Sequence, residues 1–181
     1  MEQLNFFKEF LKNWRSVGSI TPSSKFLTNK MLETVDFSKA KLNIELGSGS
    51  GIITTQLLKK MSKDSRLIAF ETSSDFYKEL KKINDDRIEV HNQSALSLEK
   101  YFGGGSVDYI ISGIPLANLS SSDKKNLLAS SYSALRSGGR FIQFQYSLES
   151  KKDLEKVFDK VNVDFTPLNI PPAFVFSCLK R

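Results

Sequence analysis

A short glycine-rich segment constrains this chain more than any other feature of its sequence. Gly47-Ser48-Gly49-Ser50-Gly51 follows residues 42–46, a mostly apolar run that we expect to form a strand, and precedes residues 52–61, which have helical apolar spacing. Glycine allows a tight turn and lets a ligand approach the main chain. The segment therefore predicts a strand–loop–helix unit with a ligand site at the loop, although an ordinary turn also accounts for glycines alone.

Strands and helices alternate along the rest of the chain. We expect strands at 42–46, 66–70, 87–91, 107–112, 139–146, 163–166 and 174–179, and helices at 52–61, 74–83, 124–135 and 154–161. This alternation is typical of an α/β fold whose parallel sheet is covered by helices on both faces. At 181 residues the chain fits one domain, with a helical N-terminal extension over 1–35 and a core over 40–181.

Two acidic residues lie at the ends of the first two expected strands. Glu45 lies two residues before Gly47, and Glu71 follows the second expected strand. The G-x-G-x-G spacing differs from the G-x-G-x-x-G of nicotinamide-binding folds, and no G-x-x-x-x-G-K-[ST] loop is present. A carboxylate beside the glycines suits a cationic ligand such as S-adenosylmethionine (SAM). Glu71 can accept hydrogen bonds from both hydroxyls of a ribose; a solvated strand-end charge is the alternative.

With these features, residues 40–181 resemble the class I SAM-dependent methyltransferases. The resemblance implies SAM as cofactor and a Rossmann-like α/β fold with a seven-stranded, mostly parallel sheet and an antiparallel last strand. In that family an acid commonly follows the third strand and contacts the adenine amine; here Ser94 stands in its place, and its hydroxyl or the amide of Gln93 is expected to replace that contact. The implied cofactor-binding residues are Glu45, Gly47, Ser48, Gly49, Gly51, Glu71, Thr72, Ser94, Ala95, Ser112, Gly113 and Ile114.

Residues 112–116, Ser-Gly-Ile-Pro-Leu, end the fourth expected strand, where methyltransferases place the methyl acceptor. Enzymes that methylate adenine often carry Asn, then Pro, then Tyr or Phe in this stretch. Here Gly113 replaces the Asn and Leu116 replaces the aromatic residue. Both groups that handle the base are missing, so we expect no nucleic-acid partner, although the overall pattern is similar to the rRNA adenine dimethylases.

The small soluble bacterial phosphatidylethanolamine N-methyltransferases resemble this chain more closely. The resemblance rests on residues 17–24 (Val-Gly-Ser-Ile-Thr-Pro-Ser-Ser), 112–116, 138–146 (Gly-Gly-Arg-Phe-Ile-Gln-Phe-Gln-Tyr) and 169–173 (Asn-Ile-Pro-Pro-Ala). It implies methyl transfer to the amine head group of a membrane phospholipid, with other aminolipids as alternatives to phosphatidylethanolamine.

Three residues are our candidates for contact with the acceptor: Tyr146, Asn118 and Pro115. The main-chain carbonyls of 112–116 and the Tyr146 hydroxyl are expected to line the acceptor pocket, and aromatic rings there can hold methylated ammonium groups. Packing at the end of a strand is the alternative role of Tyr146. An RNA adenine methyltransferase and a non-catalytic SAM-binding protein are the alternatives for the whole chain.

Residues 3–17 are predicted to form an amphipathic helix that ends at Gly18. Its polar half carries Lys8, Lys12 and Arg15, and its apolar half carries Leu4, Phe6, Phe7, Phe10, Leu11, Trp14 and Val17. This composition is that of a helix lying in a membrane interface, so we expect it to bind a phospholipid surface. Packing on the domain itself is the alternative.

A second N-terminal helix is expected after the loop 18–23. Pro22 suits its first turn, and hydroxyl-bearing neighbours at 21, 23 and 24 can cap it. Phe26, Leu27, Met31 and Leu32 follow at helical spacing.

The net charge and the rare cysteine and histidine limit where the protein can be expected to work. A formal net charge of +6 predicts attraction to the phosphates of lipid or nucleic acid. The single cysteine, Cys178, excludes an intrachain disulfide and is expected in the core, while the lone His91, at a strand end or in the core, leaves no Cys/His metal cluster. Without a visible secretory signal or spanning apolar run, we expect a cytoplasmic protein on the inner face of the cell membrane. No pattern here predicts an oligomeric state.

Overall fold

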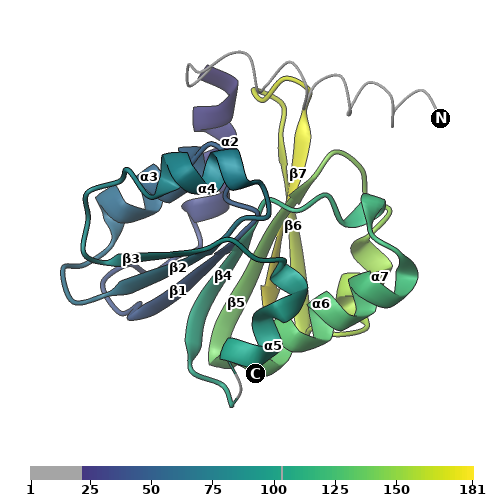
Figure 1. Ribbon diagram of the computed structural model, residues 1–181. Coiled ribbons are helices and arrows are strands. Elements are labelled where there is room, and N and C mark those ends of the chain that lie inside the picture. The colour runs from purple at the N-terminus through teal and green to yellow at the C-terminus, as the bar shows by residue number, and fades with distance from the viewer. Residues whose placement is uncertain (1–21, 103) are drawn as a thin grey trace.

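The computed structural model describes residues 22–102 and 104–181, which form a seven-stranded sheet in the order β3-β2-β1-β4-β5-β7-β6 (Figure 1). Strands β1 to β5 pair in parallel, whereas β7 is antiparallel to both β5 and β6. The expected sheet with its antiparallel last strand is confirmed. The strands are β1 (Leu42–Leu46), β2 (Arg66–Phe70), β3 (Ile88–His91), β4 (Val107–Ser112), β5 (Leu135–Gln145), β6 (Lys160–Thr166) and β7 (Ala173–Leu179).

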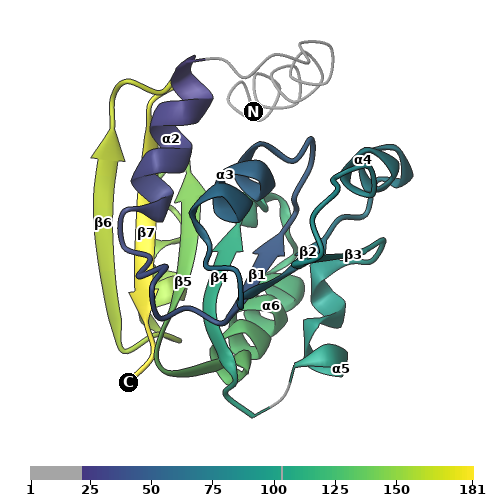
Figure 2. The same ribbon diagram turned by 90° about the vertical axis from the view of Figure 1, so that its left-hand side faces the viewer.

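Helices cover both faces of the sheet (Figure 2). Successive side chains of each strand point to opposite sides, so each face of the sheet has its own core. Ile44 and Ile110 belong to one core, which includes residues of α5 (Leu98–Tyr101), α6 (Ser121–Ala134) and α7 (Lys151–Glu155). Tyr109 and Ile111 belong to the other, with residues of α2 (Pro22–Leu32) and α3 (Ile52–Lys60), beside which lies α4 (Ser74–Leu80). Short 3-10 turns, η1 (Ala95–Ser97) and η2 (Leu116–Asn118), follow β3 and β4.

Helix α2 confirms the second expected N-terminal helix and begins at its proline. Leu27, Met31 and Leu32 are buried, whereas Phe26 keeps 46% of its surface exposed. The helix packs against α3 and β7 and therefore contributes to the core of the sheet domain. The amphipathic helix predicted over 3–17 and the cap at Thr21 lie outside the described residues. Within the described ranges, no helix has the length and apolarity needed to cross a bilayer.

The helix predicted over 154–161 is wrong in extent. Helix α7 spans Lys151–Glu155, and β6 already begins at Lys160. The reason is the alternation of Val161, Val163 and Phe165 with polar residues, a period of two that favours a strand. The predicted helix over 74–83 is also shorter, ending at Leu80, and the turns between 95 and 101 were not expected because so few of their side chains are buried.

A buried carboxylate joins three strands at the N-terminal edge of the sheet. Asp108 lies where the β4–β5 pairing is irregular. Its Oδ2 accepts hydrogen bonds from the amides of Lys41 (2.7 Å) and Leu42 (2.9 Å), and its Oδ1 accepts one from Arg136 Nε (2.6 Å). The starts of β1, β4 and β5 are thus connected at the edge opposite residues 47–51, which we call the glycine loop.

Candidate active site

The glycine loop lies at the C-terminal edge of the sheet, between β1 and α3. Gly47, Gly49 and Gly51 adopt φ values of 72°, 54° and 81°, which side-chain-bearing residues rarely adopt. The Gly47 amide donates to the carbonyl of Phe70 at 2.9 Å, so the loop is attached to the end of β2. A β-carbon at Gly49 would meet no atom within 4 Å. The loop therefore presents open main chain on which a ligand can rest.

Glu45 is buried beneath this loop and has only half of its carboxylate satisfied. Its Oε2 accepts a hydrogen bond from Thr54 Oγ1 at 2.6 Å, while Oε1 and the nearby Ser48 Oγ are buried and form no hydrogen bond of good geometry. Burial raises the pKa of Glu45 to about 8, and the nearby hydroxyls of Thr54 and Ser48 oppose this rise. A buried acceptor without a partner is costly, so the site suits a ligand that brings a cationic donor.

Glu71, at the end of β2, holds the glycine loop in place. Its Oε2 accepts a hydrogen bond from the amide of Gly49, and its Oε1 accepts one from the amide of Ser73, both at 2.7 Å. Each carboxylate oxygen has a second lone pair available. The side chain can therefore bind ribose hydroxyls while it keeps the loop closed, a double task that sequence spacing did not predict.

The segment after β3 completes the same edge. Asn92, which the sequence did not single out, donates from Nδ2 to the carbonyls of Glu71 (2.9 Å) and Thr72 (3.2 Å). The sequence marks Asn92 only as the first residue after the third expected strand. Ser94 is exposed and caps η1, where its hydroxyl accepts a hydrogen bond from the amide of Leu96, and Ala95 is buried below it.

Gln93 is already engaged within the protein. Its Oε1 accepts hydrogen bonds from Tyr101 (2.8 Å) and Ser97 (3.2 Å). Its carbonyl is thus committed to the helix that follows, which leaves the Ser94 hydroxyl, a possible donor or acceptor, as the simpler replacement for the expected acid.

The end of β4 packs directly against the glycine loop. Ser112 is buried, and its Oγ accepts a hydrogen bond from the amide of Ile114 at 3.3 Å. The amide of Gly113 donates to the carbonyl of Leu46 at 2.8 Å. A β-carbon at Gly113 would lie 2.9 Å from the carbonyl oxygen of Gly47. The structure therefore brings the cofactor-side and acceptor-side residues together, with no room for a side chain at 113.

Two glutamines of β5 fix the acceptor-side segment. Gln143 Nε2 and Gln145 Nε2 both donate to the carbonyl of Ile114, at 3.0 and 3.2 Å. This carbonyl accepts two hydrogen bonds from the protein, so both of its lone pairs are engaged. The acceptor-binding role predicted for the carbonyls of 112–116 therefore does not hold for Ile114. Both glutamines belonged to a quoted motif, but nothing in the sequence assigned them this role.

The remaining acceptor-side candidates are spread over a short turn. The amide of Asn118 donates to the carbonyl of Pro115 at 2.9 Å within η2. The side chain of Asn118 is exposed, and Leu116 between them is fully buried. Pro115 thus shapes the turn, while Asn118 reaches the surface beside it.

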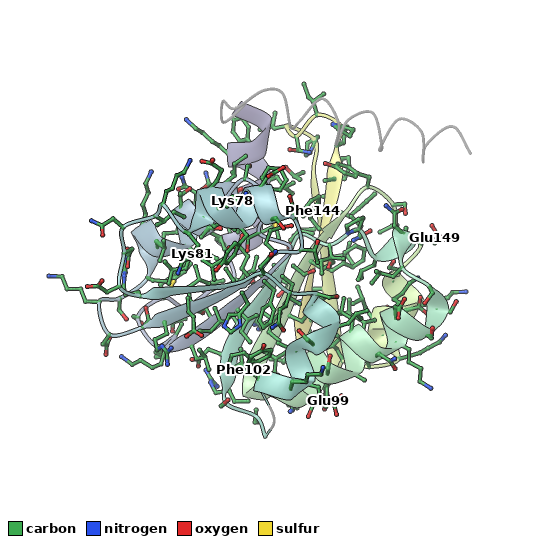
Figure 3. All side chains as sticks on the ribbon, viewed as in Figure 1. Lys78, Lys81, Glu99, Phe102, Phe144 and Glu149 are labelled. Atoms are coloured by element: carbon green, nitrogen blue, oxygen red, sulfur yellow. The ribbon has the colours of Figure 1, made fainter. Side chains whose placement is uncertain are left out.

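Tyr146 lies just after β5 and is half-buried. Burial raises the pKa of its hydroxyl to about 12, and a hydrogen bond with Asn169 opposes this rise. Its ring meets that of Phe144 edge to face, with 5.8 Å between centroids, and Figure 3 labels Phe144 in the upper middle of the molecule. Asn169, which is 2% exposed, was not among the expected site residues.

The two rare residues have structural roles. His91 ends β3, and its ring is stacked on that of Phe70 with 5.2 Å between centroids. Its Nε2 is hydrogen-bonded to Glu89 Oε1 at 2.8 Å. Cys178 is fully buried in β7, and burial raises the pKa of its thiol well above the ordinary value. Both match the expected strand-end and core placements.

The residues at this edge of the sheet lie within the part of the chain that matches a known protein family. A family model described as "Methyltransferase domain" matches residues 44–139, which include the glycine loop, Glu45, Glu71 and the Ser112–Gly113 junction. An SAM-dependent methyltransferase from Aquifex aeolicus has the same fold, with a TM-score of 0.70 and 14% identity over 89% of this chain and 94% of that one.

Two curated relatives are similar in sequence. The ornithine lipid N-methyltransferase of Singulisphaera acidiphila is 26% identical over 96% of this chain and 93% of its own length. The ribosomal RNA small subunit methyltransferase A of Pelagibacter ubique is 32% identical, but over 57% of this chain and 41% of its own length. The first similarity extends over nearly both whole chains, and the second over part of each.

Proposed function

Because this chain belongs to the methyltransferase-domain family, in which SAM is the methyl donor, we propose that it methylates the amine head group of a membrane lipid. The observation that carries the proposal is the close contact of Gly113 with Gly47. It leaves no space at the end of β4 for the amide side chain with which adenine-methylating enzymes bind their base.

A second residue supports the exclusion of a nucleobase. Leu116 occupies the position where an aromatic ring would stack on the base, and it is fully buried. An aliphatic side chain inside the core offers no stacking surface. The site therefore suits an acceptor that is held by Tyr146 rather than between an amide and a ring.

The lipid part of the proposal is supported by similarity. The relative that aligns over nearly all of this chain is named for an ornithine lipid. Phosphatidylethanolamine, the acceptor expected from the sequence motifs, shares its essential chemistry, because each is a primary amine carried by a molecule with acyl chains. We place phosphatidylethanolamine first and ornithine lipid second as acceptors.

The cofactor side can be assigned to residues whose chemistry fits. Glu45 Oε1 and Ser48 Oγ, both buried with no hydrogen bond of good geometry, would receive the ammonium group of SAM, and Glu71 would receive its ribose hydroxyls. Ser94 would face the adenine. When bound, SAM supplies an electrophilic methyl group attached to a positively charged sulfur.

The acceptor side must present a neutral amine in line with that methyl group. With a pKa of about 12, the Tyr146 hydroxyl is protonated at neutral pH, so it does not serve as the base. It can instead accept a hydrogen bond from the amine and orient its lone pair, while the Phe144 ring beside it can stabilise a methylated ammonium product. Asn118 and Pro115 would border the entrance.

The N-terminal segment supplies attachment to the membrane in this proposal. Its apolar residues, Leu4, Phe6, Phe7, Phe10, Leu11 and Trp14, would enter the interface while its lysines and arginine meet anionic lipid. These residues lie outside the described structure. The protein would act from the inner face of the cell membrane.

The test offers one protein preparation with methyl-labelled SAM to four acceptors. These are vesicles of phosphatidylglycerol with phosphatidylethanolamine, vesicles of phosphatidylglycerol with ornithine lipid, vesicles of phosphatidylglycerol alone, and ribosomal RNA. We expect label in one or both amine-bearing lipids. Label in RNA alone would replace the proposal by an RNA methyltransferase, as the partial similarity to the ribosomal enzyme suggests. SAM binding without label in any sample would favour a non-catalytic SAM-binding protein.

A further inference from the structure

The turn between β6 and β7 exposes apolar side chains at one end of the molecule. We call residues 165–172, Phe-Thr-Pro-Leu-Asn-Ile-Pro-Pro, the apolar tip. Phe165, Leu168 and Ile170 keep 53%, 62% and 75% of their surfaces exposed. No charged residue occurs from 165 to 179, so nothing within this stretch offsets the apolar surface with charge.

The apolar tip is arranged opposite to an ordinary surface loop. Its two polar side chains are buried, with Thr166 at 6% and Asn169 at 2% exposure, while its largest apolar side chains point outwards. Asn169 Nδ2 donates to the carbonyl of Pro171 at 2.6 Å, so the loop satisfies this polar group internally. A water-exposed loop usually does the reverse. This arrangement suits a loop whose surroundings are apolar.

The position of the tip identifies those surroundings. Figures 1 and 2 both show the β6–β7 turn beside the first residues of α2, at the end of the sheet that carries the glycine loop. The described structure begins at Pro22, at this same place. The exposed Lys25 of α2 adds a positive charge suited to anionic lipid beside the tip.

The tip is also connected to the candidate acceptor site. Asn169, at its centre, forms a hydrogen bond with Tyr146. This hydrogen bond joins the tip directly to the residue that we propose contacts the amine of the acceptor. An apolar surface at this point matches the half of the acceptor that is not an amine.

We propose that the apolar tip inserts into the lipid surface and seats the acceptor site on the membrane, as a second contact beside the N-terminal segment. The inference rests on the proposed lipid acceptor, but the insertion itself does not require methyl transfer. Leu168 and Ile170 enter the interface, and Asn169 keeps the loop attached to Tyr146.

Tryptophan fluorescence tests the insertion directly. The chain has one tryptophan, Trp14, so Leu168→Trp in a Trp14→Phe background reports on the tip alone. The probe is vesicles of pure phosphatidylglycerol, which lack any amine. We expect a blue shift of the emission on adding vesicles, and quenching by brominated acyl chains. An emission spectrum that vesicles leave unchanged would overturn the proposal, whether or not the protein methylates lipid.

Charge substitution gives the second measurement. Leu168→Asp with Ile170→Asp is expected to weaken vesicle binding about tenfold or more, because two side chains that insert become anionic. The matched control, Ser133→Asp with Ser137→Asp, adds the same charge at exposed sites near the start of β5, at the opposite edge. SAM affinity should be unchanged in both, which shows that the variants are folded.

The two proposals fail separately. If the tip inserts but no aminolipid is methylated, the acceptor is wrong and the tip remains. If the wild type and the doubly substituted tip bind vesicles equally, the tip has no role at the membrane, whatever the outcome of the methylation assay. A change of oligomeric state in the tip variant without loss of vesicle binding would identify the patch as a contact between copies of the chain and would also overturn the inference.

Discussion

The carboxylate of Glu71 accepts a hydrogen bond from the amide of Gly49 at 2.7 Å, across a gap of 22 residues in the sequence. The acid that follows β2 therefore holds the glycine loop that follows β1. Loss of this acceptor should weaken SAM binding in two ways, through the ribose and through the loop.

We expect Glu71→Gln to raise the dissociation constant for SAM at least tenfold, since hydrogen bonds to charged groups contribute about 1.5–3 kcal/mol. Isothermal titration calorimetry measures this. Glu89→Gln is the control, because Glu89 is an exposed carboxylate on the neighbouring strand whose partners are Arg66 and His91. Equal losses in the two variants would contradict the role assigned to Glu71.

The buried Glu45 should make stability depend on pH. Burial raises its pKa from 4.5 to about 8 in the folded, ligand-free protein. Between these values the folded state binds more protons than the unfolded state, so the contribution to stability is fully present below pH 4.5 and is lost as the pH rises through 8. The melting temperature of the wild type should therefore fall more steeply than that of Glu45→Gln as the pH rises from about 5 to about 8. Parallel pH profiles would remove Glu45 as the cause.

SAM binding should release a proton from the same residue. At pH 7 the free protein holds Glu45 largely protonated, and an ammonium group beside it favours the ionised form. Calorimetric titrations at pH 7 in two buffers of different ionisation enthalpy should report release of close to one proton. Glu45→Gln should bind SAM more weakly and release none. An equal proton count in both proteins would show that Glu45 does not meet the ammonium group.

Gly113 should not tolerate a side chain. Its φ is not in the left-handed region, so the obstacle to substitution is the close approach of the Gly47 carbonyl oxygen. Gly113→Ala is expected to cost roughly 1–3 kcal/mol of unfolding free energy, and Gly113→Asn more, by overpacking. Urea denaturation measures both. An unchanged midpoint for Gly113→Asn would show that the loop can make room for the amide, and the argument against a nucleobase would fall.

The Tyr146 hydroxyl should matter for turnover and not for the cofactor. Tyr146→Phe is expected to lower kcat about tenfold by loss of one orienting hydrogen bond. Because its pKa is about 12, the ratio of wild-type to variant kcat should stay constant from pH 7 to 9. Tyr132→Phe, which removes a hydroxyl bonded to Asp159 away from the site, is the control. If the control loses as much activity, the effect is not specific to the acceptor site.

The basic residues of the N-terminal segment should set the salt dependence of membrane binding. Replacing Lys8, Lys12 and Arg15 with serine should weaken binding to phosphatidylglycerol vesicles by roughly 100-fold, at about 1 kcal/mol per charge. The matched control replaces the exposed Lys59, Lys60 and Lys63 near the end of α3. Vesicle sedimentation at low and high salt measures the vesicle affinity of the two triple variants. Similar losses in both triple variants would show that overall charge, and not this segment, directs binding.

Much of the sheet was predictable because its strands are short apolar runs separated by glycines and helical spacing. The strands β1, β2 and β4 match their expected bounds, since nearly all of their residues are buried. Prediction failed where burial is partial. The residues of β6 alternate, but the buried Leu154 and Phe158 before it also fit helical spacing, and this extended the expected helix too far.

The candidate site was predictable to the level of residues and not of contacts. Glycines and acids at strand ends identified Glu45, Gly49 and Glu71. Sequence gave no way to foresee that Gln143 and Gln145 would meet at one carbonyl, because this depends on the twist and register between β4 and β5. The exposure of Ile170 likewise depends on how a loop is folded, and composition alone would have placed it inside.

Asp108 connects the starts of β1, β4 and β5 at the edge farthest from the glycine loop. Selection can therefore alter the loops that follow β4 and β5 without loosening the junction that closes the sheet. A directed-evolution library that randomises the turn after Pro115 should retain many folded members, whereas one that randomises Asp108 should lose most of them. New acceptor preferences would then be accessible in this scaffold by few mutational steps.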